Sequence, residues 1–407
     1  MRVAFPIHRK NYYRPLGPVI EEALRRGHQV DCWHDWGQPR RGPKGSEFPD
    51  AVPIALSRGS QVRTFRGAAD LVRRFREDPP DVVISQDPPT STLKERTSTK
   101  WVWLQYATEI LFYSTPESAL RSDALATYSP YWATKLVQRF ADSSAARDLE
   151  RCTVAVGMPE LDVLPQIDPD KVRHRLDLHR GRPVVLYLPF PLHSNPQTFW
   201  LRRVFTPATP LVRGLGTLLA WRMEYWEHVR RGWNDRRLVE SVREFCDRAG
   251  AVLVMKSRLK DPIPRYARAL ADRALYDPSH YPPTILELLS VASLCIHAYS
   301  TGVFEAAYCG VPSLCLASDR RDMGLPDYLH DLVYNGDLGG IYNWPGTAYC
   351  VALRDAFDGL RRWSLADFPL DTAARKRYVE RFLGFDDGRS SERLLDVAER
   401  VGGRACL

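Results

Sequence analysis

The segment VASLCIHAYSTGVFEAAYCGVPSLCL, residues 291–316, restricts the fold more than any other part of the chain. A short apolar run at 293–297 precedes a polar turn, 298–302, and a segment of helical spacing that begins at Val303. A second apolar run starts at Ser313, after Gly-Val-Pro. Short apolar runs that alternate with helical segments are typical of a buried parallel sheet. The segment therefore predicts strand, loop, helix and strand.

The polar turn before the predicted helix has the residues of an anion-binding loop. Ser300 and Thr301 stand where a helix N-cap is expected, and Glu305 follows in the first turn. Backbone N–H groups at a helix start, together with the positive end of the helix dipole, favour a phosphate at this place. A capped helix that holds no ligand is the alternative interpretation of the same residues.

Strands and helices alternate along most of the chain. An apolar run at 2–7 begins it, and a helical pattern at 14–26 ends at Gly27, a typical C-cap residue. This alternation predicts an α/β protein with parallel, doubly wound sheets. Further strands are predicted at residues 29–33, 81–85, 101–105, 123–128, 183–189 and 251–256, and further helices at 65–77, 130–140, 169–178, 238–249, 264–275 and 283–290.

Length and charge set limits on the class of protein. The 407 residues are enough for two domains with separate cores, and a new series of strands begins near residue 180. We therefore predict one domain at 1–180 and a second at 181–407. The net charge of +8 suits an anionic partner, such as a nucleotide diphosphate, a phospholipid headgroup or nucleic acid.

The eight cysteines contain no CxxC pair, and most stand in apolar runs. This placement predicts reduced core thiols and argues against a disulfide framework or a zinc site. No apolar run approaches the ~20 residues of a membrane-spanning helix, and no signal peptide is visible. We therefore expect a cytoplasmic protein, or one that lies peripherally on the inner face of the membrane.

An insert at 199–237 interrupts the alternation of strands and helices. Apolar residues recur on one face at helical spacing, and arginines and tryptophans are interleaved among them. A basic, aromatic amphipathic helix can lie in the headgroup layer of an anionic membrane. An ordinary helix that packs its apolar stripe on the domain is the alternative.

Several segments follow one another in a distinctive order. They are GMPELDVL at 157–164, VLYLP at 185–189, VLVMK at 252–256, YST at 299–301 and FDDGRSSER at 385–393. Over roughly residues 150–400 these segments resemble the CDP-glycerol glycerophosphotransferase (teichoic acid polymerase)-like family, which belongs to the GT-B glycosyltransferase superfamily. The closing motif at 385–393 is the most distinctive of the five.

The resemblance implies a GT-B fold, with two Rossmann-like domains that face each other across a cleft. It implies that the first domain binds the acceptor and the second binds a nucleotide-activated donor, with a C-terminal helix returning towards the first domain. Cations beside the helix start would stabilise the leaving diphosphate, so no metal and no other cofactor is expected. The implied donor-binding residues are Lys256, Arg258, His297, Tyr299, Ser300, Thr301, Gly302 and Glu305.

The sequence departs from that family at two histidines. Gln105 stands at the first position, and Arg258 stands at the second, two residues after the strand that ends in Lys256. These departures favour sugar transfer over glycerol-phosphate transfer, and leave binding of a nucleotide diphosphate unaffected. A CDP-glycerol-type polyol-phosphate transferase is kept as the alternative.

A transferase that inverts configuration needs a general base for the acceptor hydroxyl. His8 follows the first predicted strand directly, where many inverting GT-B enzymes have their histidine, and an imidazole suits this role because its ordinary pKa is near 6.5. Asp87 and Glu109, each after a strand of the first domain, are the rival carboxylate bases. A loop histidine without a catalytic role is the alternative interpretation of His8.

The sequence thus favours a metal-independent glycosyltransferase that moves a sugar from a nucleotide-sugar donor to a cell-envelope or capsular polysaccharide or glycolipid acceptor. A nucleotide-sugar 2-epimerase is a further enzyme alternative, because it has the same fold and a comparable Ser/Glu loop. An alternative from a different functional class is a non-catalytic basic protein that binds membrane or nucleic acid. No nucleic-acid-binding motif supports nucleic acid as the partner.

Overall fold

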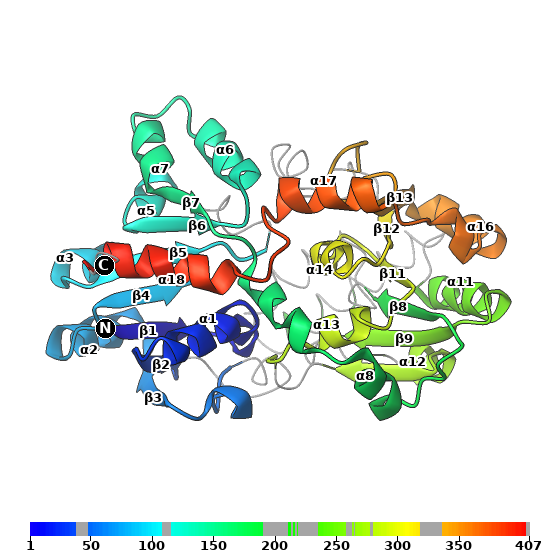
Figure 1. The fold of residues 1–407 in the computed structure, drawn as a ribbon, viewed down its shortest axis with the longest axis horizontal. Coiled ribbons are helices and arrows are strands. Elements are labelled where there is room, and N and C mark those ends of the chain that lie inside the picture. Colours follow the sequence, from blue (N-terminus) through cyan, green and yellow to red (C-terminus); the bar gives the residue numbers. More distant parts are fainter. Residues whose placement is uncertain are drawn as a thin grey trace. The chain divides into compact units, whose positions relative to one another are not determined.

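The computed structural model describes residues 1–37, 48–107, 115–189, 211–212, 215, 218, 235–257, 263, 265–276, 280–317 and 336–403 (Figure 1). Contacts divide the chain into two compact units. The first comprises Met1–Asp168, Asp277–Glu287 and Lys376–Leu407, and the second comprises Pro169–Tyr276 and Leu288–Arg375. Most of the predicted insert at 199–237 lies outside the described residues.

In the described part of the first unit, seven parallel strands form one sheet in the order β3-β2-β1-β4-β5-β6-β7. Its central strands are buried along almost their whole length, as expected where helices cover both faces of a parallel sheet. The strands are β1 (Arg2–Ile7), β2 (Gln29–Asp35), β3 (Ser60–Phe65), β4 (Val82–Ser85), β5 (Lys100–Leu104), β6 (Ala124–Thr127) and β7 (Thr153–Ala155).

Helices connect these strands and contribute to the core around Trp33, Phe75 and Trp103. The longer helical segments of this unit are α1 (Tyr13–Arg25), α2 (Gly67–Glu77), α3 (Ser91–Arg96), α6 (Pro130–Arg139), α7 (Ala146–Cys152) and α18 (Ser390–Val401). Short 3-10 segments include η1 (Lys10–Tyr12) and η4 (Pro159–Gln166).

The described part of the second unit holds a six-stranded parallel sheet in the order β10-β9-β8-β11-β12-β13. Its strands are β8 (Val184–Leu188), β9 (Val252–Ser257), β10 (Arg273–Tyr276), β11 (Leu294–His297), β12 (Ser313–Ala317) and β13 (Ala348–Ala352). Its helices include α8 (Pro169–Arg175), α11 (Asp235–Arg248), α12 (Arg265–Leu270), α14 (Gly302–Tyr308) and α16 (Leu353–Arg362). Helices α13 (Thr284–Leu289) and α17 (Thr372–Phe382) each span a division between the units along the chain.

The prediction of parallel, doubly wound sheets is confirmed, but two local predictions were wrong. The predicted helix at 65–77 begins at Gly67, because Ser60–Phe65 forms the edge strand β3. This strand is partly exposed and has the polar sequence SQVRTF, so it lacks the apolar run of a central strand. The predicted helix at 264–275 ends at Leu270, because Arg273–Tyr276 forms the edge strand β10, which is also only partly buried.

Two motifs of the sequence, GMPELDVL and FDDGRSSER, meet at the start of α18. The Asp162 carboxylate accepts hydrogen bonds from the backbone N–H groups of Ser390 (3.1 Å) and Ser391 (2.6 Å), so it caps a helix 228 residues further along the chain. Gly157 has a φ of +94°, and a Cβ there would collide with the Ser390 hydroxyl. The two motifs therefore form one structural unit.

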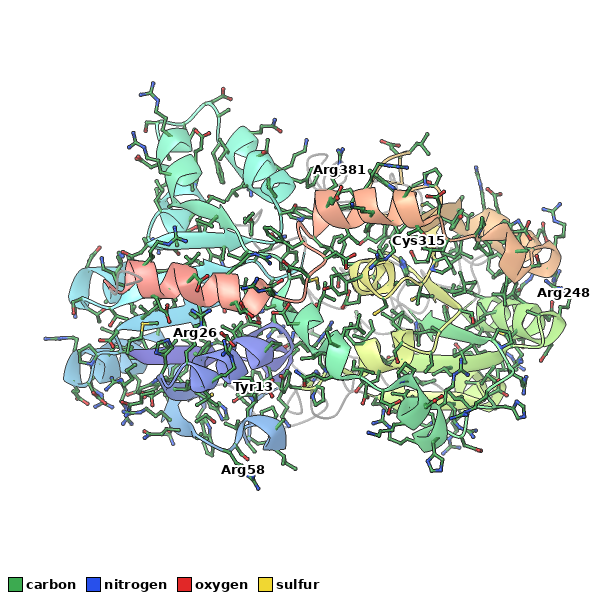
Figure 2. All side chains as sticks on the ribbon, viewed as in Figure 1. Tyr13, Arg26, Arg58, Arg248, Cys315 and Arg381 are labelled. Atoms are coloured by element: carbon green, nitrogen blue, oxygen red, sulfur yellow. The ribbon has the colours of Figure 1, made fainter. Side chains whose placement is uncertain are left out.

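Helix α18 is held to the rest of the first unit along its length. It contacts α1, β4, β5 and η4. Arg26, labelled in Figure 2, reaches it from the end of α1 and pairs with Asp396 (2.7 Å) and Glu399 (3.3 Å). Arg393 pairs with Asp387 and lies over the Phe385 ring, 3.7 Å from its centroid. None of the helices in the described ranges combines the length and the apolarity needed to traverse a bilayer.

Replacement of Asp162 by alanine tests the cap of α18. We expect Asp162→Ala to lower the free energy of unfolding by about 1–2 kcal/mol, because two amide N–H groups lose their acceptor. Urea unfolding followed by circular dichroism measures the loss. Asp142→Ala, at an exposed position, is the control. Equal stability of the two variants would contradict the capping role.

Candidate functional site

Both sheets have one point at which the strand order reverses. In the first unit it lies between β1 and β4, and in the second between β8 and β11. Ligands of doubly wound proteins bind outside the carboxyl ends of the strands at such a point. His8 and Asp87 follow β1 and β4, and His297 ends β11. The candidate residues therefore stand at these two reversal points.

His8 forms a pair with Asp35 at the first of these points. Its Nδ1 lies 3.1 Å from the Asp35 Oδ2, and the Asp35 carboxylate also accepts the N–H groups of Gly37 (2.8 Å) and Gly67 (3.4 Å). The Asp35 side chain is 4% exposed and that of His8 is 34% exposed. Solvent or a ligand can therefore reach the imidazole, whereas the carboxylate is buried behind it.

The electrostatics of this pair favour an ionised carboxylate. Burial alone would raise the pKa of Asp35, but the hydrogen bonds from His8 and from the two glycine amides outweigh it and lower the pKa below its usual value. An ionised Asp35 accepts the proton on Nδ1 of His8, so Nε2 of the neutral ring carries the lone pair. The pair can thus orient a histidine that accepts a proton.

Asp35 was not among the residues predicted from the sequence. The strand predicted at 29–33 ended two residues too early, since β2 continues to Asp35. Strands β1 and β2 pair in parallel with Ile7 opposite His34. The residues that follow this pair, His8 and Asp35, are therefore neighbours. The signal that could have found Asp35 is its place at the carboxyl end of the strand beside β1.

Aromatic and carboxylate side chains surround His8. Its ring packs edge-on against Phe65 and Tyr12, with centroids 5.4 Å and 6.3 Å apart. The Tyr12 hydroxyl donates to Asp87 Oδ2 at 3.0 Å, and burial together with the Asp87 charge raises the pKa of Tyr12, which stays a neutral donor. The structure therefore brings His8, Asp35, Tyr12 and Asp87 into one group, which we call the His8 cluster. The third predicted base, Glu109, lies outside the described residues.

The second point carries the loop that follows β11. His297, with no exposed surface, accepts the Ser300 N–H at Nδ1 (3.3 Å), and burial lowers the pKa of His297 to about 3. The ring is therefore neutral and protonated at Nε2, which has no hydrogen-bond partner among the described residues. Tyr299 has a φ of +45°, and its carbonyl accepts the Tyr342 hydroxyl at 3.1 Å. These contacts make the loop a defined turn.

Helix α14 begins at Gly302, one residue before the predicted start. Ser300 Oγ accepts the Gly302 N–H at 3.1 Å, whereas the Thr301 side chain makes no cap hydrogen bond. Backbone carbonyls of the loop accept the next two N–H groups, those of Val303 and Phe304. These N–H groups of the first turn already have acceptors within the protein. Binding of a phosphate here would therefore depend strongly on neighbouring side chains.

Lys256, another predicted donor-binding residue, lies at the same edge of the sheet. Lys256 in β9 stands level with Leu188 of the central strand β8, and Leu188 is paired with His297. Lys256 is 8% exposed and Glu305, in α14, is 1% exposed. Arg258 lies outside the described residues. Among the described residues, no group of three or more His, Cys, Asp or Glu side chains is arranged to hold a metal ion.

No protein-family model matches the chain, and no curated protein matches its sequence. Solved structures do match. The wall teichoic acid polymerase TagF, in a variant soaked with CDPG, aligns with a TM-score of 0.59 and 15% identity over 98% of this chain and 89% of that chain. UDP-GlcNAc 2-epimerase from Neisseria meningitidis, bound to UDP-GlcNAc, aligns with a TM-score of 0.55 and 12% identity over 98% and 100%. The S. aureus MnaA–UDP structure aligns with a TM-score of 0.56 and 11% identity over 99% and 97%.

This chain has the GT-B fold. The two parallel sheets are its twin Rossmann-like domains, as the sequence predicted. Identities of 11–16% to the matched structures show the fold alone, and the reaction must be argued from the side chains at the two sheet edges.

The ionised state of Asp35 makes part of the stability depend on pH. Because the folded pKa is lowered, Asp35 stabilises the fold above its unfolded pKa of about 3.9, and this contribution is lost as pH falls through the folded value. We expect Asp35→Asn to lower the free energy of unfolding by about 1–2 kcal/mol at about pH 7, through weaker hydrogen bonds. Below about pH 4 the difference in the free energy of unfolding between the variant and the wild type should become smaller. Denaturant titrations at pH values above and below this point measure the difference. A difference that does not change with pH would contradict an ionised Asp35.

Proposed function

We propose that the protein is a metal-independent glycosyltransferase. It moves a sugar from a nucleotide-activated donor to a hydroxyl group of a cell-envelope or capsular polysaccharide or glycolipid. The observation that carries this proposal is the pairing of His8 with a buried, ionised Asp35 at the carboxyl edge of the first sheet. A histidine oriented in this way is suited to take the proton of an acceptor hydroxyl.

In the proposed reaction, Nε2 of His8 accepts the acceptor proton, and Asp35 stabilises the imidazolium that forms. The acceptor oxygen forms a bond to the anomeric carbon while the bond from that carbon to the donor phosphate breaks. The nucleoside diphosphate leaves with the electron pair of the broken bond. Tyr12 and Asp87, which are hydrogen-bonded to each other beside His8, are assigned to bind acceptor hydroxyl groups.

The donor is assigned to the edge of the second sheet. Lys256 and Arg258 contribute positive charge for the diphosphate, in the place of a metal ion. The hydroxyl groups of Ser300 and Thr301 and the Nε2–H of His297 are assigned to the phosphate and sugar, and Glu305 to the ribose. Tyr299 and Gly302 shape the loop that carries them.

Two other reactions on the same fold are the competing candidates. A nucleotide-sugar 2-epimerase, which has the same fold and a comparable Ser/Glu loop, is the second candidate. The motif resemblance favours a polyol-phosphate transferase as the third. The three candidates need different substrates. The glycosyltransferase needs a nucleotide-sugar donor and an acceptor, the epimerase needs a nucleotide sugar alone, and the polyol-phosphate transferase needs CDP-glycerol and an acceptor.

The first experiment is a thermal-shift screen against CDP, UDP, GDP and CMP. A ligand that binds only the native state raises the melting temperature, and a diphosphate should do so more than CMP. The preferred nucleotide then selects the sugar donors for a release assay with and without polysaccharide acceptors. Nucleotide release that needs an acceptor supports the proposal. Isomerised sugar without release would establish the epimerase, and release from CDP-glycerol alone would establish the polyol-phosphate transferase.

Replacement of His8 tests the base. We expect His8→Ala to reduce turnover by about 10²- to 10⁴-fold, because the acceptor hydroxyl loses its proton acceptor, with donor affinity unchanged. The release assay and nucleotide titration measure the two effects separately. His174→Ala, an exposed histidine of α8, is the matched control and should behave as the wild type. Wild-type turnover in His8→Ala would exclude His8 as the base.

Replacement of Glu305 tests the donor site. Glu305→Gln keeps the side-chain volume but removes the charge, so we expect nucleotide affinity to fall by about tenfold, the loss expected for a hydrogen bond to a charged group. Calorimetric titration with the nucleotide found in the screen measures the affinity, and the melting temperature reports the fold. Glu380→Gln, at an exposed position of α17, is the control. An unchanged dissociation constant would remove Glu305 from the ribose site.

A further inference from the structure

Two cysteines of neighbouring strands stand directly beside each other under the loop that follows β11. Strands β12 and β13 pair in parallel with Cys315 opposite Cys350. Side chains of paired residues point to the same face of a parallel sheet, and neighbouring strands lie about 4.8 Å apart. This spacing falls within the Cα separations of disulfides, about 4.4–6.8 Å. Both cysteines are free thiols here.

The two thiols differ in accessibility. Cys315, labelled in Figure 2, is fully buried, whereas Cys350 is partly exposed. The Cys350 Sγ lies 3.2 Å from the place that a Cβ on Gly336 would occupy, so the absence of a side chain at Gly336 leaves room for this sulfur. A reagent from solvent can therefore meet Cys350 first, with Cys315 directly behind it.

The hydrogen bond between the thiols distinguishes Cys350 from the other cysteines. The Cys315 S–H donates to Cys350 and lowers the pKa of Cys350 below its usual value, while burial raises the pKa of Cys315. Burial raises the pKa of each of the other described cysteines, which are Cys32, Cys152, Cys246, Cys295 and Cys309. The thiolate is the reactive form, so Cys350, which is also the more exposed of the two, is the thiol of this pair that reacts first.

The pair is also linked to the loop at 299–301. The Tyr299 N–H donates to the Cys315 Sγ at 3.5 Å. Tyr299 holds a left-handed backbone conformation, which is unfavourable for a bulky residue and depends on contacts such as this one and the Tyr342 hydroxyl on its carbonyl. A change at the Cys315 sulfur therefore acts directly on the backbone of this loop.

We propose that Cys315 and Cys350 form a reversible disulfide that changes the conformation of the loop at 299–301. A hydroperoxide is the oxidant. The Cys350 thiolate attacks one peroxide oxygen, the O–O bond breaks, and Cys350 becomes a sulfenic acid as water or an alcohol leaves. The Cys315 sulfur then attacks the Cys350 sulfur, losing its proton, and the S–O bond breaks to release water. Two thiols are oxidised and one peroxide is reduced.

The loop responds because the sulfur has to move. Disulfide formation draws the Cys315 Sγ from hydrogen-bonding separation to a covalent bond of about 2.05 Å with Cys350. The Tyr299 N–H then loses its acceptor, and the left-handed backbone at Tyr299 loses one of its supports. The consequence for nucleotide binding rests on the proposed function, whereas the cross-link and the change in the loop do not.

The cross-link is tested on the full-length protein. The reduced protein is treated with hydrogen peroxide, its remaining thiols are blocked with maleimide, and it is digested without reductant for mass spectrometry. We expect a linked pair of peptides that contains Cys315 and Cys350, is two hydrogens lighter than their sum, and separates on reduction. Cys309→Ser, at the partly buried C-cap of α14, should retain the link, and Cys350→Ala should abolish it. Cys350 oxidised to sulfinic acid without a link, or no oxidation, would overturn the proposal.

The effect on the loop is measured by hydrogen exchange. Peptides that cover residues 298–308 should exchange faster in the oxidised wild type than in the reduced protein, and peroxide should cause no such change in Cys350→Ala. A linked protein with unchanged exchange would overturn the coupling. In the same samples, oxidation should weaken nucleotide binding by about fivefold, equivalent to one net hydrogen bond. If neither the reduced nor the oxidised protein binds a nucleotide, the proposed donor site is rejected. The linked peptide and the hydrogen exchange still test the disulfide and its effect on the loop.

Discussion

Parallel pairing of the strands is the constraint on which the rest of the structure depends. Every strand pair of the two described sheets is parallel, so all carboxyl ends of a sheet lie at one edge. The strands satisfy their backbone groups with one another and bury apolar side chains on both faces. Apolar residues therefore fill most sheet positions, although β2 also buries Asp31 and His34, and many polar side chains stand at or just beyond the carboxyl ends of the strands. Both groups of candidate residues lie at such an edge.

The same constraint explains how distant residues become partners. His8 and Asp35 are 27 residues apart, yet each stands one position beyond a pair of residues that face each other in β1 and β2. Burial of the carboxylate would be costly by itself, and the imidazole and two backbone amides compensate for it. The interaction stabilises the fold and orients the ring at once. In the second sheet, pairing places Lys256 and His297 on the two sides of Leu188.

The sheet edge of the second unit combines two chemistries. Its loop at 299–301 follows β11 and leads into α14, whose last carbonyls are held by the Arg375 guanidinium. The thiols of Cys315 and Cys350 lie below the loop, and one of them accepts its Tyr299 N–H. The proposed donor site and the proposed oxidisable pair thus share this hydrogen bond. The sequence predicted reduced core thiols, and two of them, Cys315 and Cys350, have a specific place in the proposed chemistry of the loop.

Apolar runs, helical spacing and the motif around residue 300 were sufficient to predict the α/β class, the two parallel sheets and most central elements, because burial on both faces imposes a continuous apolar run on a central strand. The edge strands β3 and β10 were missed because they are only partly buried and lack that run. By itself, the sequence thus determined the fold class and the positions of His8, Asp87 and the loop after β11. Only the tertiary structure decided that Asp35 orients His8, that Asp162 caps α18, and that Cys315 adjoins Cys350. Each of these pairings depends on strand register or helix docking between distant segments, and no local pattern of residues encodes them.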